Sequence, residues 1–123
     1  MNIPEDLYYT KNHEWLRLED EMAIIGITDY AQSELGDIIF VELPDKGVSF
    51  DVGDSIGTIE AVKTVADIFT PFKGEIAEVN QNLENIPESI NKDPYISGWI
   101  IKICNFIKNN SELLSASEYK KYI

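Results

Sequence analysis

Segments with β-strand character recur at short spacing along the chain. They are rich in β-branched and aromatic residues, and several alternate apolar with polar positions, which is the period of a half-buried strand. Turn-forming residues separate them, for example from Pro44 to Gly47 and from Pro71 to Gly74. We therefore expect a mostly β protein with strands over residues 15–18, 22–27, 38–43, 55–60, 65–69, 75–80 and 99–104.

Short helices are expected between some of these strands. Thr28 is a suitable N-cap for a helix that continues to Leu35, and Gly36 can adopt the positive φ that ends it. A second helix is expected to begin after Ile86, with a proline in its first turn. Both are too short to be stable alone, so they must pack on the β structure.

The end of the chain predicts a third helix. Ser115 and Glu118 have the spacing of a capping box, in which each residue satisfies a backbone amide of the other. The pattern that follows places Tyr119, Tyr122 and Ile123 on one side, and we expect that side to pack on the sheets.

A weak internal repeat flanks Lys63. The pattern Gly-x-x-Ile-x-x-Ile from Gly53 is echoed by Gly-x-Ile-x-x-Val from Gly74, and Lys63 lies midway between the two glycines. If a quasi two-fold axis relates the halves, the chain must reverse direction at Lys63. The adjacent Val62 and Thr64 resist the positive φ of a tight two-residue hairpin, so a type I turn in a longer loop is expected. Local rules are often broken at functional sites.

Length and charge narrow the class of protein. The 123 residues fit one domain, which we assign to residues 1–123. The net charge of −12 argues against nucleic acid or an anionic membrane as partners, but it is compatible with basic protein surfaces. No apolar run approaches the ~20 residues of a membrane span. Residues 1–6 lack the features of a signal or transit peptide. We expect a cytoplasmic protein if the source is bacterial, and one of the mitochondrial matrix if it is eukaryotic.

The residues around Lys63 resemble the core of lipoyl and biotinyl carrier domains, in which a central lysine is acylated by the cofactor. The resemblance rests on Val52-Gly53-Asp54, on residues 59–63 and on the Pro-x-x-Gly-x-Ile-x-x-Val pattern from Pro71. Biotin carriers usually flank the lysine with methionines, whereas Val62 and Thr64 stand here, so lipoate is preferred. Motifs outside the core resemble the H-protein of the glycine cleavage system: residues 13–15, 26–32, 35–37, 40–44, 91–95 and 98–99.

This resemblance implies a fold and a function. The fold would be a barrel-sandwich hybrid of two small antiparallel sheets with short helices and a C-terminal helix. The protein would be a carrier and not an enzyme, with lipoate attached to Lys63. It would take an aminomethyl group from a pyridoxal-phosphate glycine decarboxylase to a tetrahydrofolate-dependent aminomethyltransferase, and pass electrons to dihydrolipoyl dehydrogenase. A lipoyl ligase or transferase would attach the cofactor.

The resemblance also implies site residues. Glu14 and Asp67 would line a cleft for the cationic amine of the loaded arm, with Asn12 as a polar neighbour. From the residues alone, Glu14 and Asp67 would instead be interpreted as solvated surface carboxylates. Glu60, Val62 and Thr64 would be recognised by the modifying enzyme, although Glu60 could be an ordinary carboxylate at a strand end.

The sequence leaves other functions and sites to be weighed. His13, the single histidine, has no second ligand or triad partner near it in sequence, which favours a structural role and no metal site. Two other functions remain open: a relay that donates lipoate to 2-oxoacid dehydrogenases, and an unmodified protein-binding module.

Overall fold

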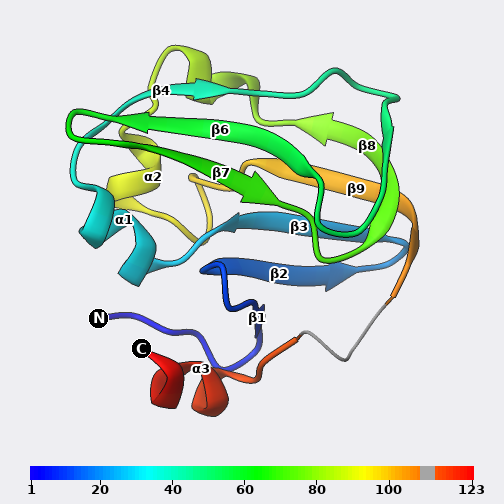
Figure 1. Cartoon of the computed structure of the whole chain (residues 1–123), viewed down its shortest axis with the longest axis horizontal. Coiled ribbons are helices and arrows are strands. Elements are labelled where there is room, and N and C mark those ends of the chain that lie inside the picture. The colour runs from blue at the N-terminus through cyan, green and yellow to red at the C-terminus, as the bar shows by residue number, and fades with distance from the viewer. Residues whose placement is uncertain (109–112) are drawn as a thin grey trace.

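Two antiparallel β-sheets form the body of the protein in the computed structural model, which describes residues 1–108 and 113–123 (Figure 1). The larger sheet has six strands in the order β1-β2-β3-β9-β8-β5, and the smaller has three in the order β4-β6-β7. The strands are β1 (Tyr8–Tyr9), β2 (Glu14–Glu19), β3 (Met22–Ile27), β4 (Ile38–Glu42), β5 (Ser49–Phe50), β6 (Ser55–Ala61), β7 (Val65–Phe69), β8 (Lys73–Val79) and β9 (Ile101–Ile107).

The main core lies between the sheets, because alternate residues of the strands point inward. In the smaller sheet Val41 and Ile59 are paired across β4 and β6, and both are buried. In the larger sheet Ile76 of β8 is paired with Ile103 of β9, and both belong to the same buried cluster. This alternation is the period-two pattern from which the strands were predicted.

The expected mostly β fold with two antiparallel sheets and a C-terminal helix is confirmed. Each of the seven predicted segments contains a strand, although β9 begins two residues later than predicted and β8 begins at Lys73. The strands β1 and β5 were not predicted. They have two residues each, so they carry no readable periodicity and exist only because longer strands pair with them.

The helix α1 (Asp29–Leu35) has the predicted ends. The amide of Ala31 donates to the Thr28 hydroxyl at 3.1 Å, and Gly36 ends the helix at a φ of +79°. The next helical segments are the 3₁₀ helix η1 (Gln81–Glu84) and α2 (Ser89–Lys92). The prediction that α2 begins directly after Ile86 was two residues early, because residues 87 and 88 form a turn before the helix.

The helix α3 (Ala116–Tyr122) has the predicted capping box, with both reciprocal hydrogen bonds present. The prediction that Tyr119, Tyr122 and Ile123 form one packed side is confirmed for Tyr119, holds in part for Tyr122, whose ring centroid lies 5.8 Å from that of His13, and was wrong for Ile123. Tyr119 is fully buried and stacks on Tyr9 with ring centroids 4.7 Å apart, but Tyr122 is 49% and Ile123 37% exposed. A helix of seven residues placed against the short β1 buries only one turn of its surface.

Candidate functional site

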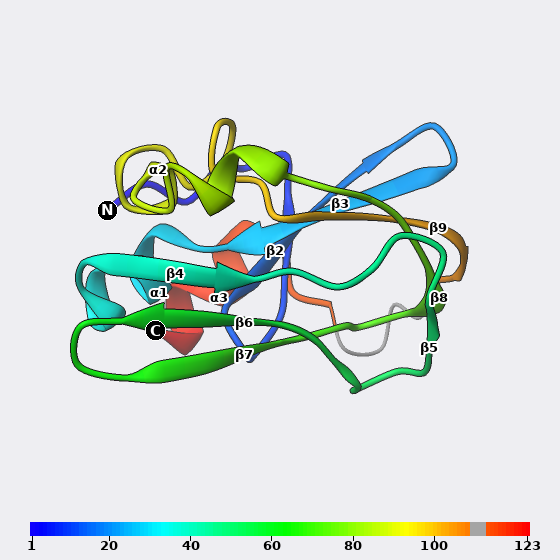
Figure 2. The same ribbon diagram turned by 90° about the horizontal axis from the view of Figure 1, so that it is seen from above.

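Lys63 lies in the turn that joins β6 to β7, and its side chain is exposed. The chain reversal predicted at this residue is therefore confirmed. The last strand pair is Glu60 with Val65, and the amide of Ala61 donates to the carbonyl of Thr64 at 2.8 Å. No residue of the turn has a positive φ, in keeping with its β-branched composition. Figures 1 and 2 both show this turn at the end of the molecule where α1 lies.

The backbone of the turn is held from the side. The amide of Val62 donates to the carbonyl of Asp37 at 3.1 Å, in the segment between α1 and β4. Asn91 of α2 holds that segment on both sides of Asp37: its Oδ1 accepts from the amide of Ile38 at 3.0 Å, and its Nδ2 donates to the carbonyl of Gly36 at 2.9 Å. The turn thus combines an exposed lysine side chain with an anchored backbone.

The predicted recognition residues surround Lys63 on the surface. Glu60 and Thr64 are exposed, and Val62 is 69% exposed, so none of the three is part of the core. Val65, which was not predicted, is 60% exposed beside them. The structure therefore groups all three predicted residues at the tip with Lys63.

Glu14 is buried, with a relative exposure of 1%. Its Oε1 accepts a hydrogen bond from the hydroxyl of Thr10, and its Oε2 accepts one from the amide of Phe69 at 3.3 Å. Burial raises the pKa of Glu14 to about 7, and these two hydrogen bonds offset only part of that rise. The alternative that Glu14 is a solvated surface carboxylate is thus wrong, because β2 and β7 enclose it.

Glu14 forms part of the wall of a pocket of about 260 Å³. The pocket is lined by Thr10, Lys11, Asn12, Glu14, Val52, Gly53, Phe69, Thr70 and Pro71. The expected neighbour Asn12 is thus beside Glu14. Thr10 was missed in the sequence, where a threonine four residues before a glutamate has no special meaning.

Asp67 lines a second pocket of about 260 Å³ and not the pocket of Glu14. Its carboxylate is exposed and accepts hydrogen bonds from the hydroxyls of Ser55 and Thr58 at 3.2 and 3.4 Å. Asn12 lines both pockets and so connects them. The residues of the second pocket are Asn12, His13, Ile27, Tyr30, Ala31, Glu34, Leu35, Ile59, Ala66 and Asp67.

The second pocket contains a carboxylate that the sequence did not single out. Glu34 lies on α1, and the pocket between α1 and the smaller sheet brings it to the same lining as Asp67. In the sequence it is one acidic residue of an amphipathic helix, so no local signal marks it.

His13 lines the second pocket and contacts the C-terminal helix. Its Nδ1 lies 2.8 Å from the hydroxyl of Tyr119, which in turn lies 2.7 Å from the hydroxyl of Thr28. Its backbone has a φ of +67°, and burial lowers the pKa of its imidazole. These contacts support the predicted structural role, since they fix the loop that contains Asn12 and leads into β2 at Glu14.

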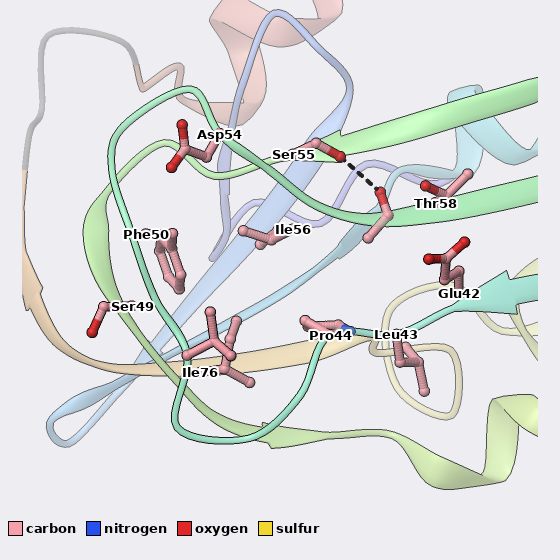
Figure 3. A pocket seen from close by; sticks show the side chains of 12 residues that line it. Glu42, Leu43, Pro44, Ser49, Phe50, Asp54, Ser55, Ile56, Thr58 and Ile76 are labelled. Atoms are coloured by element: carbon pink, nitrogen blue, oxygen red, sulfur yellow. Dashed lines mark hydrogen bonds between the residues drawn. The ribbon is translucent and has the colours of Figure 1, made fainter.

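A larger pocket of about 440 Å³ lies at the start of β6, away from Lys63 (Figure 3). Phe50, Ile56 and Ile76 give it an apolar side, and the carboxylates of Glu42 and Asp54 lie at opposite ends. The pocket follows β6 from Ser55 as far as Thr58, and residues 59–61 separate it from the turn of Lys63. None of the predicted site residues lines it.

Comparisons with known proteins agree over almost the whole chain. Residues 7–123 match the family described as glycine cleavage H-protein. The glycine cleavage system H protein of Herpetosiphon aurantiacus is 52% identical over 99% of this chain and 94% of its own length. The protein of the same name from Bacteroides thetaiotaomicron is 50% identical over 100% of this chain and 98% of its own length. The crystal structure of such a protein from Mycobacterium marinum superposes with a TM-score of 0.88, at 38% identity over 97% of each chain.

In the described part of the chain, no helix is long and apolar enough to cross a membrane.

Proposed function

This chain belongs to the glycine cleavage H-protein family, and from that membership we propose that it is a lipoyl carrier whose cofactor is joined to Nζ of Lys63. The observation that carries the proposal is the exposed lysine on an anchored turn. A primary amine on a flexible stem suits amide formation with a carboxylic acid. An anchored backbone keeps the root of the arm at a constant place while the arm moves.

The surroundings of Lys63 fit this group. Its neighbours Val62 and Val65 are exposed, so an enzyme can approach the amine without unfolding the protein. Within residues 1–108 and 113–123 the lysines in ion pairs are Lys73, Lys102 and Lys120, so no described carboxylate competes for the amine of Lys63. When attached, lipoate supplies a disulfide that accepts the one-carbon cargo and electrons.

The proposed partners follow from the family's role in glycine cleavage. Glycine decarboxylase would deliver the aminomethyl group, a tetrahydrofolate-dependent aminomethyltransferase would receive it, and dihydrolipoyl dehydrogenase would reoxidise the arm. A lipoyl ligase or transferase would modify Lys63. The protein itself would catalyse none of these steps.

Glu14, Asp67 and Asn12 would hold the amine of the cargo between the two pockets. A cation beside the buried Glu14 would favour its ionised form and so reverse the rise in its pKa that burial causes. Asn12, common to both linings, offers an amide oxygen to the same amine. Asp67 would add a second negative charge at the exposed side.

The test is incubation with lipoyl ligase, ATP and lipoate, followed by intact-mass analysis and peptide mapping. One lipoyl group on Lys63 is expected. Lys63→Arg should remain unmodified and should change the free energy of unfolding by less than ~0.5 kcal/mol. Lys46→Arg and Lys73→Arg are matched controls at exposed turn and strand positions and should be modified like the wild type. A lipoyl group on Lys46 or Lys73, with Lys63 free, would overturn the assignment.

A further inference from the structure

A β-bulge in β4 exposes two consecutive apolar residues. The pairing of β4 with β6 shifts register between Ile38 and Phe40, so Ile39 has no partner. Ile38 and Val41 are 3% and 2% exposed, whereas Ile39 and Phe40 are 53% and 50% exposed. In a regular strand, one residue of such an adjacent pair would face inward. Bulges commonly redirect side chains near functional sites.

These residues lie close to the turn of Lys63, although β4 is more than twenty positions away in sequence. Strand pairing places Phe40, Glu60 and Val65 in one row across β4, β6 and β7, directly before the turn. We call the four exposed apolar residues at this end the tip patch. They are Ile39, Phe40, Val62 and Val65, each at least half exposed. Single exposed apolar residues are common, but a group around one functional lysine indicates an interaction site.

The tip patch has an acidic border. The next row on the same face of the smaller sheet is Glu42, Thr58 and Asp67. Glu60 lies in the first row, between Phe40 and Val65. The three strands contain these three carboxylates and no lysine or arginine. A complementary partner therefore has an apolar centre with a basic border.

We propose that the tip patch is the surface on which the enzyme that acylates Lys63 docks, with Ile39 and Phe40 of β4 providing half of it; this rests on the proposed function. The acylating enzyme is chosen because of how close to Lys63 each enzyme must come. An enzyme that acts on the end of a long arm can work at a distance from the turn. An acylating enzyme must bring an activated carbonyl carbon to the amine itself, so it must contact the turn and its neighbours.

The reaction that requires this contact is an acyl transfer. Lipoate and ATP first form the acyl adenylate and release pyrophosphate. Nζ of Lys63 then attacks the carbonyl carbon of this adenylate, the amide bond forms, AMP leaves and the amine loses a proton. The anchored turn and the patch would together hold Nζ in line for this attack.

The experiment measures steady-state lipoylation by ligase, ATP and lipoate. Ile39→Ser and Phe40→Ser should each lower kcat/KM about tenfold, mainly through KM, as expected for a residue in the centre of an interface. The matched control is Ile107→Ser, because Ile107 is also on a strand and 66% exposed but lies at the far end of β9. It should stay within about twofold of wild type. Ile39→Thr keeps the β-branched shape, so it replaces Ile39→Ser if that variant does not fold.

A second readout separates recognition from accessibility. A small reactive acetyl ester should label Lys63 equally in all variants, since it needs no docking. If Ile39→Ser and Phe40→Ser are lipoylated at the wild-type rate, or if Ile107→Ser loses as much, the docking surface is wrong while the lipoyl-carrier function stands. If wild-type Lys63 is not lipoylated at all, the proposed function itself fails.

Discussion

The backbone amide of Val62 donates a 3.1 Å hydrogen bond to the carbonyl oxygen of Asp37, directly beside the lysine that we propose to be modified. The two residues are far apart in sequence, and they belong to the β6–β7 turn and to the α1–β4 connection. The Ala61–Thr64 hydrogen bond holds the turn from within, and the Val62–Asp37 bond ties it to a segment outside the hairpin. This contact keeps the backbone of the tip in place while its side chains remain exposed.

Asn91→Ala should loosen this end of the molecule. The Asn91 side chain bonds to Ile38, Gly36 and Gln32, and its loss leaves partly buried backbone groups without partners. We expect a loss of about 1–3 kcal/mol in the free energy of unfolding by urea, and faster hydrogen exchange at Val62. Asn82→Ala, at an exposed position of η1, is the control. Unchanged exchange at Val62 would show that the turn is rigid without Asn91.

Val62→Asp should affect recognition and not stability. The side chain is 69% exposed, so the melting temperature should stay close to that of the wild type. Lipoylation should slow, because a charge replaces an apolar contact next to Lys63. The measurements are a thermal melt and the time course of lipoylation by mass spectrometry. A large drop in melting temperature would contradict the exposed placement of Val62.

Glu14→Gln should change how stability depends on pH. Burial raises the pKa of Glu14 to about 7 from its ordinary 4.5, so the folded protein keeps a proton that the unfolded chain has already released. Through Glu14, stability is therefore lost as pH rises between these values, and the loss is complete above the folded pKa. At ~1.4 kcal/mol per pH unit, this loss is about 3 kcal/mol.

The free energy of unfolding should thus fall less between about pH 5 and about pH 8 in Glu14→Gln than in wild type, by up to about 3 kcal/mol. Urea denaturation at the two pH values measures it. Glu42→Gln, which alters an exposed carboxylate, should follow the wild-type dependence. Parallel curves for wild type and Glu14→Gln would mean that Glu14 ionises as an ordinary carboxylate.

The cargo should be lost faster when its carboxylates are removed. A pair between the loaded amine and a partly enclosed carboxylate should be worth about 1–2 kcal/mol, between the limits for exposed and buried pairs. Glu14→Ala or Asp67→Ala should therefore speed spontaneous loss of the aminomethyl group by roughly five- to thirtyfold. The larger effect is expected for the buried Glu14.

Mass spectrometry of loaded protein, with the enzymes removed, measures this decay. Glu42→Ala should decay like wild type, because Glu42 lines neither the pocket of Glu14 nor that of Asp67. Reoxidation of the unloaded, reduced arm by dihydrolipoyl dehydrogenase should be the same in all variants. Equal decay in all would assign the holding of the amine to other residues, such as Glu34.

The sequence by itself determined the features that depend on neighbours along the chain. The seven longer strands, the Thr28 cap of α1 and the Ser115–Glu118 capping box were predicted from the sequence, because side-chain alternation and capping act over a few residues. The reversal at Lys63 was also predicted, since the repeat on either side of it fixes where the chain must turn.

Only the tertiary structure decided which of these residues meet and which are buried. Glu14 and Asp67 were indistinguishable as acidic residues, yet Phe69, 55 positions from Glu14, encloses one while the other stays exposed in a separate pocket. The exposure of Ile39 and Phe40 follows from the register of β4 against β6, which no local pattern encodes. Such contacts join distant segments, and their geometry exists only once both sheets have closed over the shared core.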